Sequence, residues 1–507
     1  MMSDEQELRS GEHSIQWCLL SHTNIGKTTL TRTLMAGDVG EVEDAAHVTS
    51  QSQRYLLQKT QQGDELWLWD TPGFGDSVRL YERLRQQGNP LGWFLSNVWD
   101  RWRDKPFYLS QRALLAARDH ADVMLYLVNA AEDPADAGYW SAEMNILAWL
   151  EKPVIVLLNQ IGSDTRQEQA AQDLQRWKQA TQSFRNVVRD VLVLDAFTRS
   201  WWHERKMMQS IEPLLPAAKQ EAYRRLLQQH QQQQQQREQA SLQVMAEQLQ
   251  MAAGLHEKLD PEQGKLLARA WQGLSQLTSR LSKSTAAEGS LDAQARAAVE
   301  RLMLGLRQSD VLATQRLLEI HQLDGQAASQ IQEQLRSQLK VSKPVDAQAA
   351  SLWGAVTAGA ATGLGADLMA GGLTLGTGAL VGALVGALTF GGAAWGANKM
   401  FDQEQQSFQL SLDYLTSLVS QVLLKYLLIS HFGRGRGRYT SPAAPEQWSD
   451  AVQAVVQSQA GQWAGIWEQL RSEALEDDAV DIRQGMQQLL AQSLQQVMER
   501  LYPDLQA

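Results

Sequence analysis

Two short segments near the start of the chain hold residue types that bind phosphate and magnesium. The first, residues 21–29 (SHTNIGKTT), follows an apolar run and precedes a helical pattern, the strand–loop–helix context of a P-loop. In such a loop, backbone N–H groups point at phosphate oxygens, Lys27 reaches the outer phosphates and the Thr28 hydroxyl binds Mg²⁺. Gly26 lets the backbone approach closely. The segment therefore predicts a nucleoside triphosphate site.

The second segment, residues 67–77 (WLWDTPGFGDS), also follows a strand-like run. We expect Asp70 at the strand end to hold Mg²⁺ through water and the Gly73 N–H to meet the γ-phosphate. Two phosphate-linked elements in this order are a stronger signal than either one alone. Between them, Thr49 is the candidate for capping Mg²⁺ and sensing the γ-phosphate, with Ser50 or neither residue as the alternatives.

The part of the site that would read the base is less clear. Asn159 follows the run VIVLL, where an NKxD motif would place an aspartate at position 162. Gly162 stands there and cannot accept hydrogen bonds from guanine, while Asp164 is an alternative acceptor. After the run VLVL, Asp195 and Ala196 stand at the place of the loop that packs on the base. The residues leave the choice between guanine and adenine open.

The predicted site therefore has three groups of residues, one for catalysis, one for the metal and one for the nucleotide. Ser21 occupies the first position, where a glycine is usual. The candidates are Lys27 and Thr49 for catalysis, Thr28, Thr49 and Asp70 for the metal, and Ser21, Asn24, Gly26, Lys27, Thr28, Thr29, Gly73, Asn159, Asp195 and Ala196 for the nucleotide.

Two further residues bear on hydrolysis. Phe74 stands where small GTPases often have a glutamine that orients water, and an apolar side chain cannot do this. We therefore expect slow turnover that a cation, dimerisation or a partner accelerates. His22 lies inside the loop, where we expect it to face solvent, with a phosphate contact as the alternative.

These motifs resemble those of translation-factor-related GTPases. NIGKTTL is similar to the Era group, and DTPGFGD is similar to septins. GNPLGWFL, NAAEDPADAGY, VIVLLNQIG, LDAFTRSW and HFGRGRGRY resemble a bacterial family that joins a G domain to a C-terminal domain of unknown function 3482. The resemblance covers nearly the whole chain and implies binding of GTP or GDP with Mg²⁺, and GTP hydrolysis.

Apolar runs alternate with helical patterns up to about residue 215. Such runs are typical of buried parallel strands, and the alternation indicates βαβ units. The pattern predicts an α/β P-loop G domain over residues 1–215, with a mixed, mostly parallel sheet and helices on both faces. The predicted strands are residues 15–20, 66–69, 123–128, 154–158 and 191–194.

The remainder of the chain predicts helices. Residues 216–345 are rich in Gln, Ala, Leu, Glu and Arg, which favours helices and coiled-coil pairing, with a Gln-rich stretch at 226–239. Residues 346–400 form a Gly/Ala-rich apolar segment, predicted as a helical hairpin. Residues 401–507 form a C-terminal helical region, in which a heptad spacing runs from Phe408 to Ile429.

The apolar segment has two interpretations. Glycines at every fourth position, as at Gly378, Gly382 and Gly386, let helices approach as they do in membranes. Residues 353–397 could therefore engage a lipid bilayer. Asp367 opposes insertion, and a hairpin buried in a helical bundle is the alternative.

Composition limits the classes of function. A net charge of -11 argues against a nucleic-acid partner, and a single cysteine excludes a disulfide framework within the chain. The polar N-terminus has no secretory pattern, so we expect a cytoplasmic protein at the cytoplasmic face of the inner membrane. The main hypothesis is a GTP-driven membrane-associated switch or remodelling protein. The alternatives are a soluble regulatory GTPase and a non-hydrolysing scaffold, and the helical region could bind a protein partner or a second copy.

Overall fold

The computed structural model describes ten stretches of the chain. These are residues 11–35, 52–96, 104–159, 167–194, 200–259, 293–323, 388–391, 406–432, 446–472 and 478–502. The chain divides into two units, Met1–Arg237 with Ser430–Pro442, and Glu238–Ile429 with Ala443–Ala507. Most of the glycine-rich segment and the run after Phe432 lie outside the described residues.

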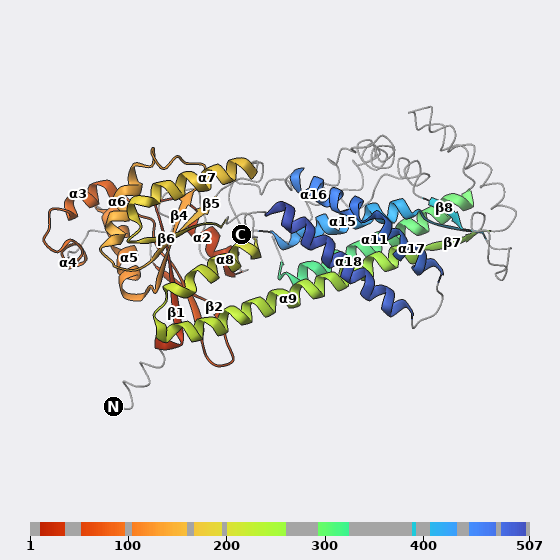
Figure 1. Ribbon diagram of the computed structural model, residues 1–507, viewed down its shortest axis with the longest axis horizontal. Helices are drawn as coiled ribbons and strands as arrows, with labels where there is room; N and C mark the ends of the chain where they lie inside the picture. The colour runs from red at the N-terminus through yellow and green to blue at the C-terminus, as the bar shows by residue number, and fades with distance from the viewer. Residues whose placement is uncertain are drawn as a thin grey trace. The chain divides into compact units, whose positions relative to one another are not determined.

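A six-stranded sheet forms the centre of the first unit (Figure 1), in the order β2-β3-β1-β4-β5-β6. β2 is antiparallel to β3, and the other neighbours are parallel. β1 has β3 on one side and β4 on the other, and open α/β sheets bind ligands at the carboxyl ends of strands at such a switch in strand order. The strands are β1 Ser14–Ser21, β2 Gln53–Lys59, β3 Glu65–Asp70, β4 Val123–Asn129, β5 Val154–Asn159 and β6 Val188–Val193.

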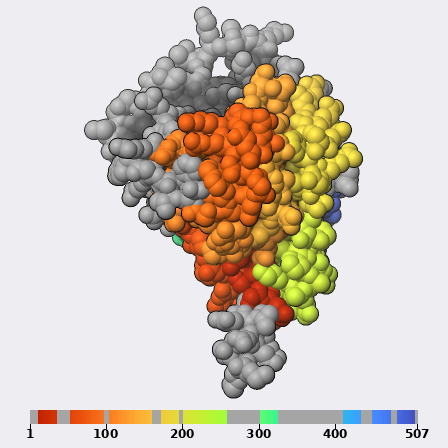
Figure 2. All heavy atoms as spheres, turned by 90° about the vertical axis from the view of Figure 1, so that its left-hand side faces the viewer, coloured from red at the N-terminus to blue at the C-terminus, as the bar shows by residue number. Residues whose placement is uncertain are grey.

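Helices cover both faces of this sheet, as the alternating pattern predicts. One face packs against α3 (Ser77–Leu84), α4 (Pro90–Ser96), α5 (Lys105–His120), α6 (Gly138–Ala148) and α7 (Gln167–Ala180). The other packs against α2 (Lys27–Met35), α8 (Trp201–Ile211) and the start of α9 (Ala217–Gly254). Two short 3₁₀ turns, η1 (Thr181–Phe184) and η2 (Glu212–Leu214), complete the unit. In Figure 2, the orange residues of α3 to α5 lie near the yellow residues of α7.

The described part of the segment between β3 and β4 packs on the face of the sheet that α3 to α7 cover. Phe94 of α4 and Phe107 of α5 are buried in the same cluster as the strand residues Tyr126 and Val128. Both α4 and α5 are therefore helices that pack on the sheet. Residues 97–103 between them lie outside the described part.

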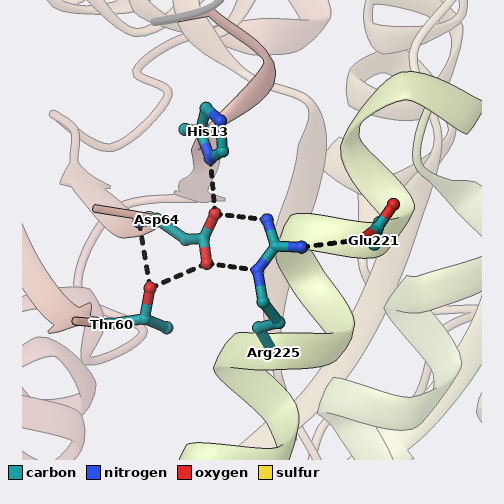
Figure 3. A network of polar contacts seen from close by, with 5 residues as sticks. All are labelled: His13, Thr60, Asp64, Glu221 and Arg225. Carbon is teal, nitrogen blue, oxygen red and sulfur yellow. Dashed lines mark hydrogen bonds and ion pairs between the residues drawn. The ribbon is translucent and has the colours of Figure 1, made fainter. Parts of the chain in front are cut away.

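A buried carboxylate fixes the start of α9 to the sheet (Figure 3). Asp64, in the turn between β2 and β3, accepts hydrogen bonds of 2.8 Å from Nε and Nη2 of Arg225, which lies on α9. Thr60 Oγ1 donates to it at 2.7 Å, and Nδ1 of His13 lies 2.6 Å from it. Glu221 lies 3.0 Å from Arg225 Nη1. The yellow-green start of α9 accordingly lies beside the red start of β1 in Figure 2.

This network predicts acid sensitivity. Burial alone would raise the pKa of Asp64, but the hydrogen bonds from Arg225, His13 and Thr60 outweigh it and hold the pKa at about 2, below the ordinary 3.8. A depressed carboxyl pKa stabilises the fold above about pH 4, and this contribution of about 2 kcal/mol is lost as the pH falls through 2. Urea denaturation between pH 7 and pH 2 should show this loss. Asp64→Asn, which cannot ionise, should give a flatter pH dependence.

The second unit is mainly helical. Its described helices are the remainder of α9, α11 (Ala293–Ile320), α15 (Leu412–Ser430), α16 (Glu446–Ser458), α17 (Ala460–Ser472) and α18 (Asp478–Leu501). The Gln-rich stretch lies within α9, a single continuous helix. The residues of the heptad spacing from Leu415 to Ile429 are buried on α15, because this helix packs on several neighbours.

Three short strands in this unit differ from the sequence prediction. β7 (His256–Leu259), β9 (Gln406–Leu410) and β8 (Leu388–Gly391) form an antiparallel sheet in that order. Phe408 therefore lies in a strand, and the heptad helix begins only at Leu412. Leu388–Gly391, the only part of the glycine-rich segment that is described, is a strand and not helix. The β-propensity of Thr389 and Phe390 and the pairing with β9 favour the extended form there.

One helix in the described part of the chain passes a simple test for a membrane span. α15 has a mean hydropathy of 1.3 over the tested stretch, and 61% of that stretch is buried inside the protein. Core helices have the same composition and burial, so packing inside the protein accounts for the apolar composition of α15.

Candidate functional site

The loop of residues 22–26 joins the carboxyl end of β1 to the start of α2. Asn24 and Gly26 adopt positive φ values of 63° and 100°, the left-handed region that Gly and Asn tolerate best. These turns carry the backbone around the position where phosphates would lie, and α2 then begins at Lys27, so the N-terminus of this helix faces that position. Asn24 is exposed, whereas Thr29 is buried within α2.

Lys27 is held by the residue at the first loop position. Its Nζ donates a 2.8 Å hydrogen bond to Ser21 Oγ, and both side chains are buried. Burial lowers the pKa of Lys27 to about 8, while the charges of Asp70 and Glu143 oppose the fall. The serine that departs from the usual glycine thus orients the lysine. The sequence alone gave no sign of this contact.

Thr28, at the start of α2, and Asp70, at the end of β3, are in contact. Thr28 Oγ1 donates a 2.7 Å hydrogen bond to Asp70 Oδ2, although the two residues belong to different elements. Burial raises the pKa of Asp70, and the hydrogen bond from Thr28 and the charge of Lys27 oppose that rise. Lys27, Thr28 and Asp70, predicted to act together, therefore lie in one place.

These oxygens fit Mg²⁺. Asp70 Oδ1 is buried without a hydrogen-bond partner among the described residues, and the Thr28 hydroxyl lies beside the same carboxylate. Mg²⁺ prefers oxygen ligands and is usually held by one or two protein groups together with phosphate and water. No group of three or more His, Cys, Asp or Glu side chains in the described residues could hold a metal by itself. The observed pair is thus the kind of site that a nucleotide would complete.

Gly73 is pressed against the loop. A Cβ atom at this position would lie 2.9 Å from Thr23 Cα and 3.2 Å from Lys27 Nζ. The next residue, Phe74, is buried, and its N–H donates a 2.9 Å hydrogen bond to Ser21 O. The segment after β3 is therefore fixed to the loop, with its backbone beside the side chain of Lys27.

Gly73→Ala should consequently impair the site more than the fold. The added methyl group must push Thr23 or the lysine away, which displaces groups that would touch the outer phosphates. We expect affinity for a GTP analogue to fall about tenfold, equivalent to about 1.4 kcal/mol, with a smaller change for GDP. Titration of both nucleotides measures this difference. Gly88→Ala, where a Cβ meets nothing within 4 Å, is the matched control and should bind both nucleotides normally.

At the base end, the structure places one of the predicted residues. Asn159 is buried at the end of β5, and its Nδ2 donates a 2.7 Å hydrogen bond to Ile25 O in the loop. Its side chain thus supports the loop backbone from the end of β5. Gly162, Asp164, Asp195 and Ala196 lie outside the described residues, as does Thr49.

His22 differs from the expectation of a solvent-facing side chain. Its Nδ1 lies 2.7 Å from Glu143 Oε1, and its ring stacks on Tyr139. The side chain is only 28% exposed, because α6 covers it. No sequence pattern links His22 to residues so far along the chain.

Comparisons with families match both parts of the chain. Residues 17–160 match the family described as 50S ribosome-binding GTPase. Residues 182–496, more than half of the chain, match the domain of unknown function DUF3482. No curated protein matches the chain.

Among solved structures, the chain is similar to Era bound to MgGDPNP and part of 16S ribosomal RNA, at 17% identity and a TM-score of 0.31. The match covers 40% of this chain and 57% of that one. Era from Aquifex aeolicus bound to GDP and aluminium fluoride gives the same values. A chloroplast translocon component matches at 14% identity and a TM-score of 0.22, covering 38% of this chain and 73% of that one. The chain thus spans little more than half the length of the Era structures.

Proposed function

The chain belongs to the family of the domain of unknown function DUF3482, joined to a GTP-binding P-loop GTPase domain, and from this premise we propose that it binds GTP with Mg²⁺ and hydrolyses it slowly. The observation that carries the proposal is the meeting of Lys27 and the Thr28–Asp70 pair at the carboxyl ends of neighbouring strands. These are the groups that phosphoryl transfer requires, because it depends mainly on positioning and charge stabilisation.

Each group has a role in the proposed reaction. The loop N–H groups and Lys27 bind the outer phosphates and neutralise charge that develops on them. Thr28 and Asp70 would hold Mg²⁺, which when bound supplies further positive charge to the phosphate oxygens. The N–H of Gly73 would contact the γ-phosphate.

Slow turnover follows from the residue after Gly73. Phe74 is fully buried and apolar, so it offers no hydrogen bond to an attacking water. Ser21 O already accepts the Phe74 N–H, which fixes this segment in place. Acceleration by a cation, a partner or a second copy of the chain belongs to the proposal.

A phosphate-release assay with GTP and ATP tests this function. We expect release from GTP only, at a rate that Mg²⁺ increases, and competition by GDP but not by ADP. Equal release from ATP would remove the guanine preference. An absence of release with intact GTP binding would favour the non-hydrolysing scaffold, which Phe74 makes the second candidate.

We further propose that the glycine-rich segment, residues 353–397, associates with the cytoplasmic face of a membrane. The proposal rests on the glycine spacing and on the scarcity of charge in the segment, where Asp367 is the one charged residue and opposes insertion. Flotation of the full chain with liposomes, with and without GTP, is the test. A chain that stays at the bottom of the gradient in both cases would favour a soluble regulatory GTPase.

A further inference from the structure

His22, which follows Ser21 at the start of the loop, is held by two side chains of α6. Its Nδ1 lies 2.7 Å from Glu143 Oε1, and its ring stacks on Tyr139 with centroids 4.2 Å apart and planes 10° apart. The Nδ1–H of His22 is the donor in this contact, and Oε1 of the Glu143 carboxyl group is the acceptor. The two contacts together fix both the tautomer and the plane of the imidazole ring.

Glu143 is itself fully buried. Its second oxygen, Oε2, accepts a hydrogen bond from the hydroxyl of Tyr126 on β4. Burial, followed by the charge of Glu143, holds the pKa of Tyr126 well above its usual value, so the hydroxyl stays protonated and donates. Each carboxylate oxygen therefore has one partner. A buried carboxylate is costly, and an apolar side chain of similar size would stabilise the fold at least as well. Its presence beside the loop therefore calls for a role other than stability.

The position of His22 suggests that role. Its backbone pairs with Phe74 in an isolated parallel bridge, next to the hydrogen bond from Phe74 N to Ser21 O. The following residue, Thr23, is the nearest neighbour that a Cβ atom at Gly73 would meet. His22 thus lies where the loop meets the segment after β3: its backbone is paired with that segment, and its side chain is held by α6.

We propose that Glu143 is a positioning residue for the nucleotide, because through His22 it holds the loop against α6 in the form that receives the phosphates. The proposal rests on the proposed function, since it concerns the same site. Without the contact, the loop samples other arrangements, and nucleotide binding must then order it at the expense of affinity. Residues of α6 thereby become part of the phosphate site without touching the ligand.

The same unit offers a matched control. His13 makes a contact of the same kind, 2.6 Å from Asp64 Oδ1, with the carboxylate again fully buried. This pair lies at the amino end of β1, whereas His22 follows the carboxyl end of the same strand. Loss of either histidine therefore removes an imidazole–carboxylate contact, but only His22 lies in the loop.

The test uses the full chain with Mg²⁺ and a fluorescent GTP analogue, together with thermal unfolding. We expect His22→Ala to weaken binding about tenfold, the size of one lost charge-assisted hydrogen bond. His22→Asn, which keeps a donor near the Nδ1 position, should recover part of the affinity. His13→Ala should lower the melting temperature and bind the analogue normally. The double variant His22→Ala/Glu143→Leu should bind no more weakly than His22→Ala, because each change by itself removes the same hydrogen bond.

Three results would overturn the proposal. One is binding by His22→Ala within twofold of the unchanged protein. Another is an affinity loss in the double variant equal to the product of the two single losses, since independent effects multiply. The third is an equal loss of affinity in His13→Ala, which would indicate general destabilisation. If the unchanged protein binds no GTP analogue, the proposed function fails first, and that outcome is distinct from the other three.

Discussion

Lys27→Ala should abolish detectable GTP hydrolysis and weaken binding of a GTP analogue by about 100-fold, the upper range for a charged hydrogen bond to phosphate. In the structure its ammonium group is buried, bonded to Ser21 Oγ and close to the charges of Asp70 and Glu143. Burial of the ammonium group is unfavourable because the group loses its hydration. The negative charge of a triphosphate would offset this loss. Phosphate release and analogue titration measure the two losses.

Lys152→Ala is the control for that substitution. Lys152 is also partly buried in the first unit, but it donates to the carbonyl oxygens of Ala117 and Arg118 at the end of α5. Its loss should leave nucleotide binding and hydrolysis unchanged. Hydrolysis by Lys27→Ala at the rate of Lys152→Ala would mean that the loop does not bind the outer phosphates.

The second large effect concerns Arg225 and the attachment of α9. Arg225→Ala leaves the fully buried Asp64 without its two guanidinium hydrogen bonds, while His13 and Thr60 remain. Removal of one partner from a buried pair typically costs 3–5 kcal/mol, and we expect about 2–3 kcal/mol because Arg225 is partly exposed. Urea denaturation of the full chain, with hydrogen exchange of the β2–β3 peptides, measures the loss.

The adjacent arginine provides the control. Arg224 forms an ion pair with Glu212, and both side chains are more exposed, at 55% and 27%. Exposed pairs contribute about 0–1 kcal/mol, so Arg224→Ala should be nearly neutral. If Arg224→Ala and Arg225→Ala destabilise the chain equally, the contact with Asp64 does not hold α9 on the sheet.

The sequence predicts the part of the fold that depends on local pattern. Five strands, β1 and β3 to β6, overlap the apolar runs. β4 and β5 are buried almost throughout and so read as continuous hydrophobic sequence, whereas β6 has the exposed Arg189 in its first half and only its second half matches the run. β2 (QRYLLQK) was missed because it is an edge strand with mostly exposed residues. β9 was missed because the spacing of Phe408 happens to continue the heptad of the helix after it.

The candidate site likewise combines residues that short motifs predict with contacts that only the folded chain shows. Lys27, Thr28, Asp70 and Gly73 were identified from two short motifs whose spacing reflects backbone geometry. The partners of His22 and Asp64 come from residues more than a hundred positions away, at Glu143 and Arg225. Only the folded chain brings such side chains together, because no local periodicity connects them. The hydroxyl of Ser21 is a related case, since its departure from glycine gave no indication of a bond to Lys27.

Calorimetric titration of the full chain with a non-hydrolysable GTP analogue, with and without Mg²⁺, examines the core of this interpretation. One bound nucleotide per chain, with affinity that collapses when Mg²⁺ is removed or when Asp70 is changed to alanine, is the predicted result. Two results would contradict a shared phosphate–magnesium site at Lys27, Thr28 and Asp70. One is the absence of binding heat with the unchanged protein, and the other is the same binding heat with and without Mg²⁺.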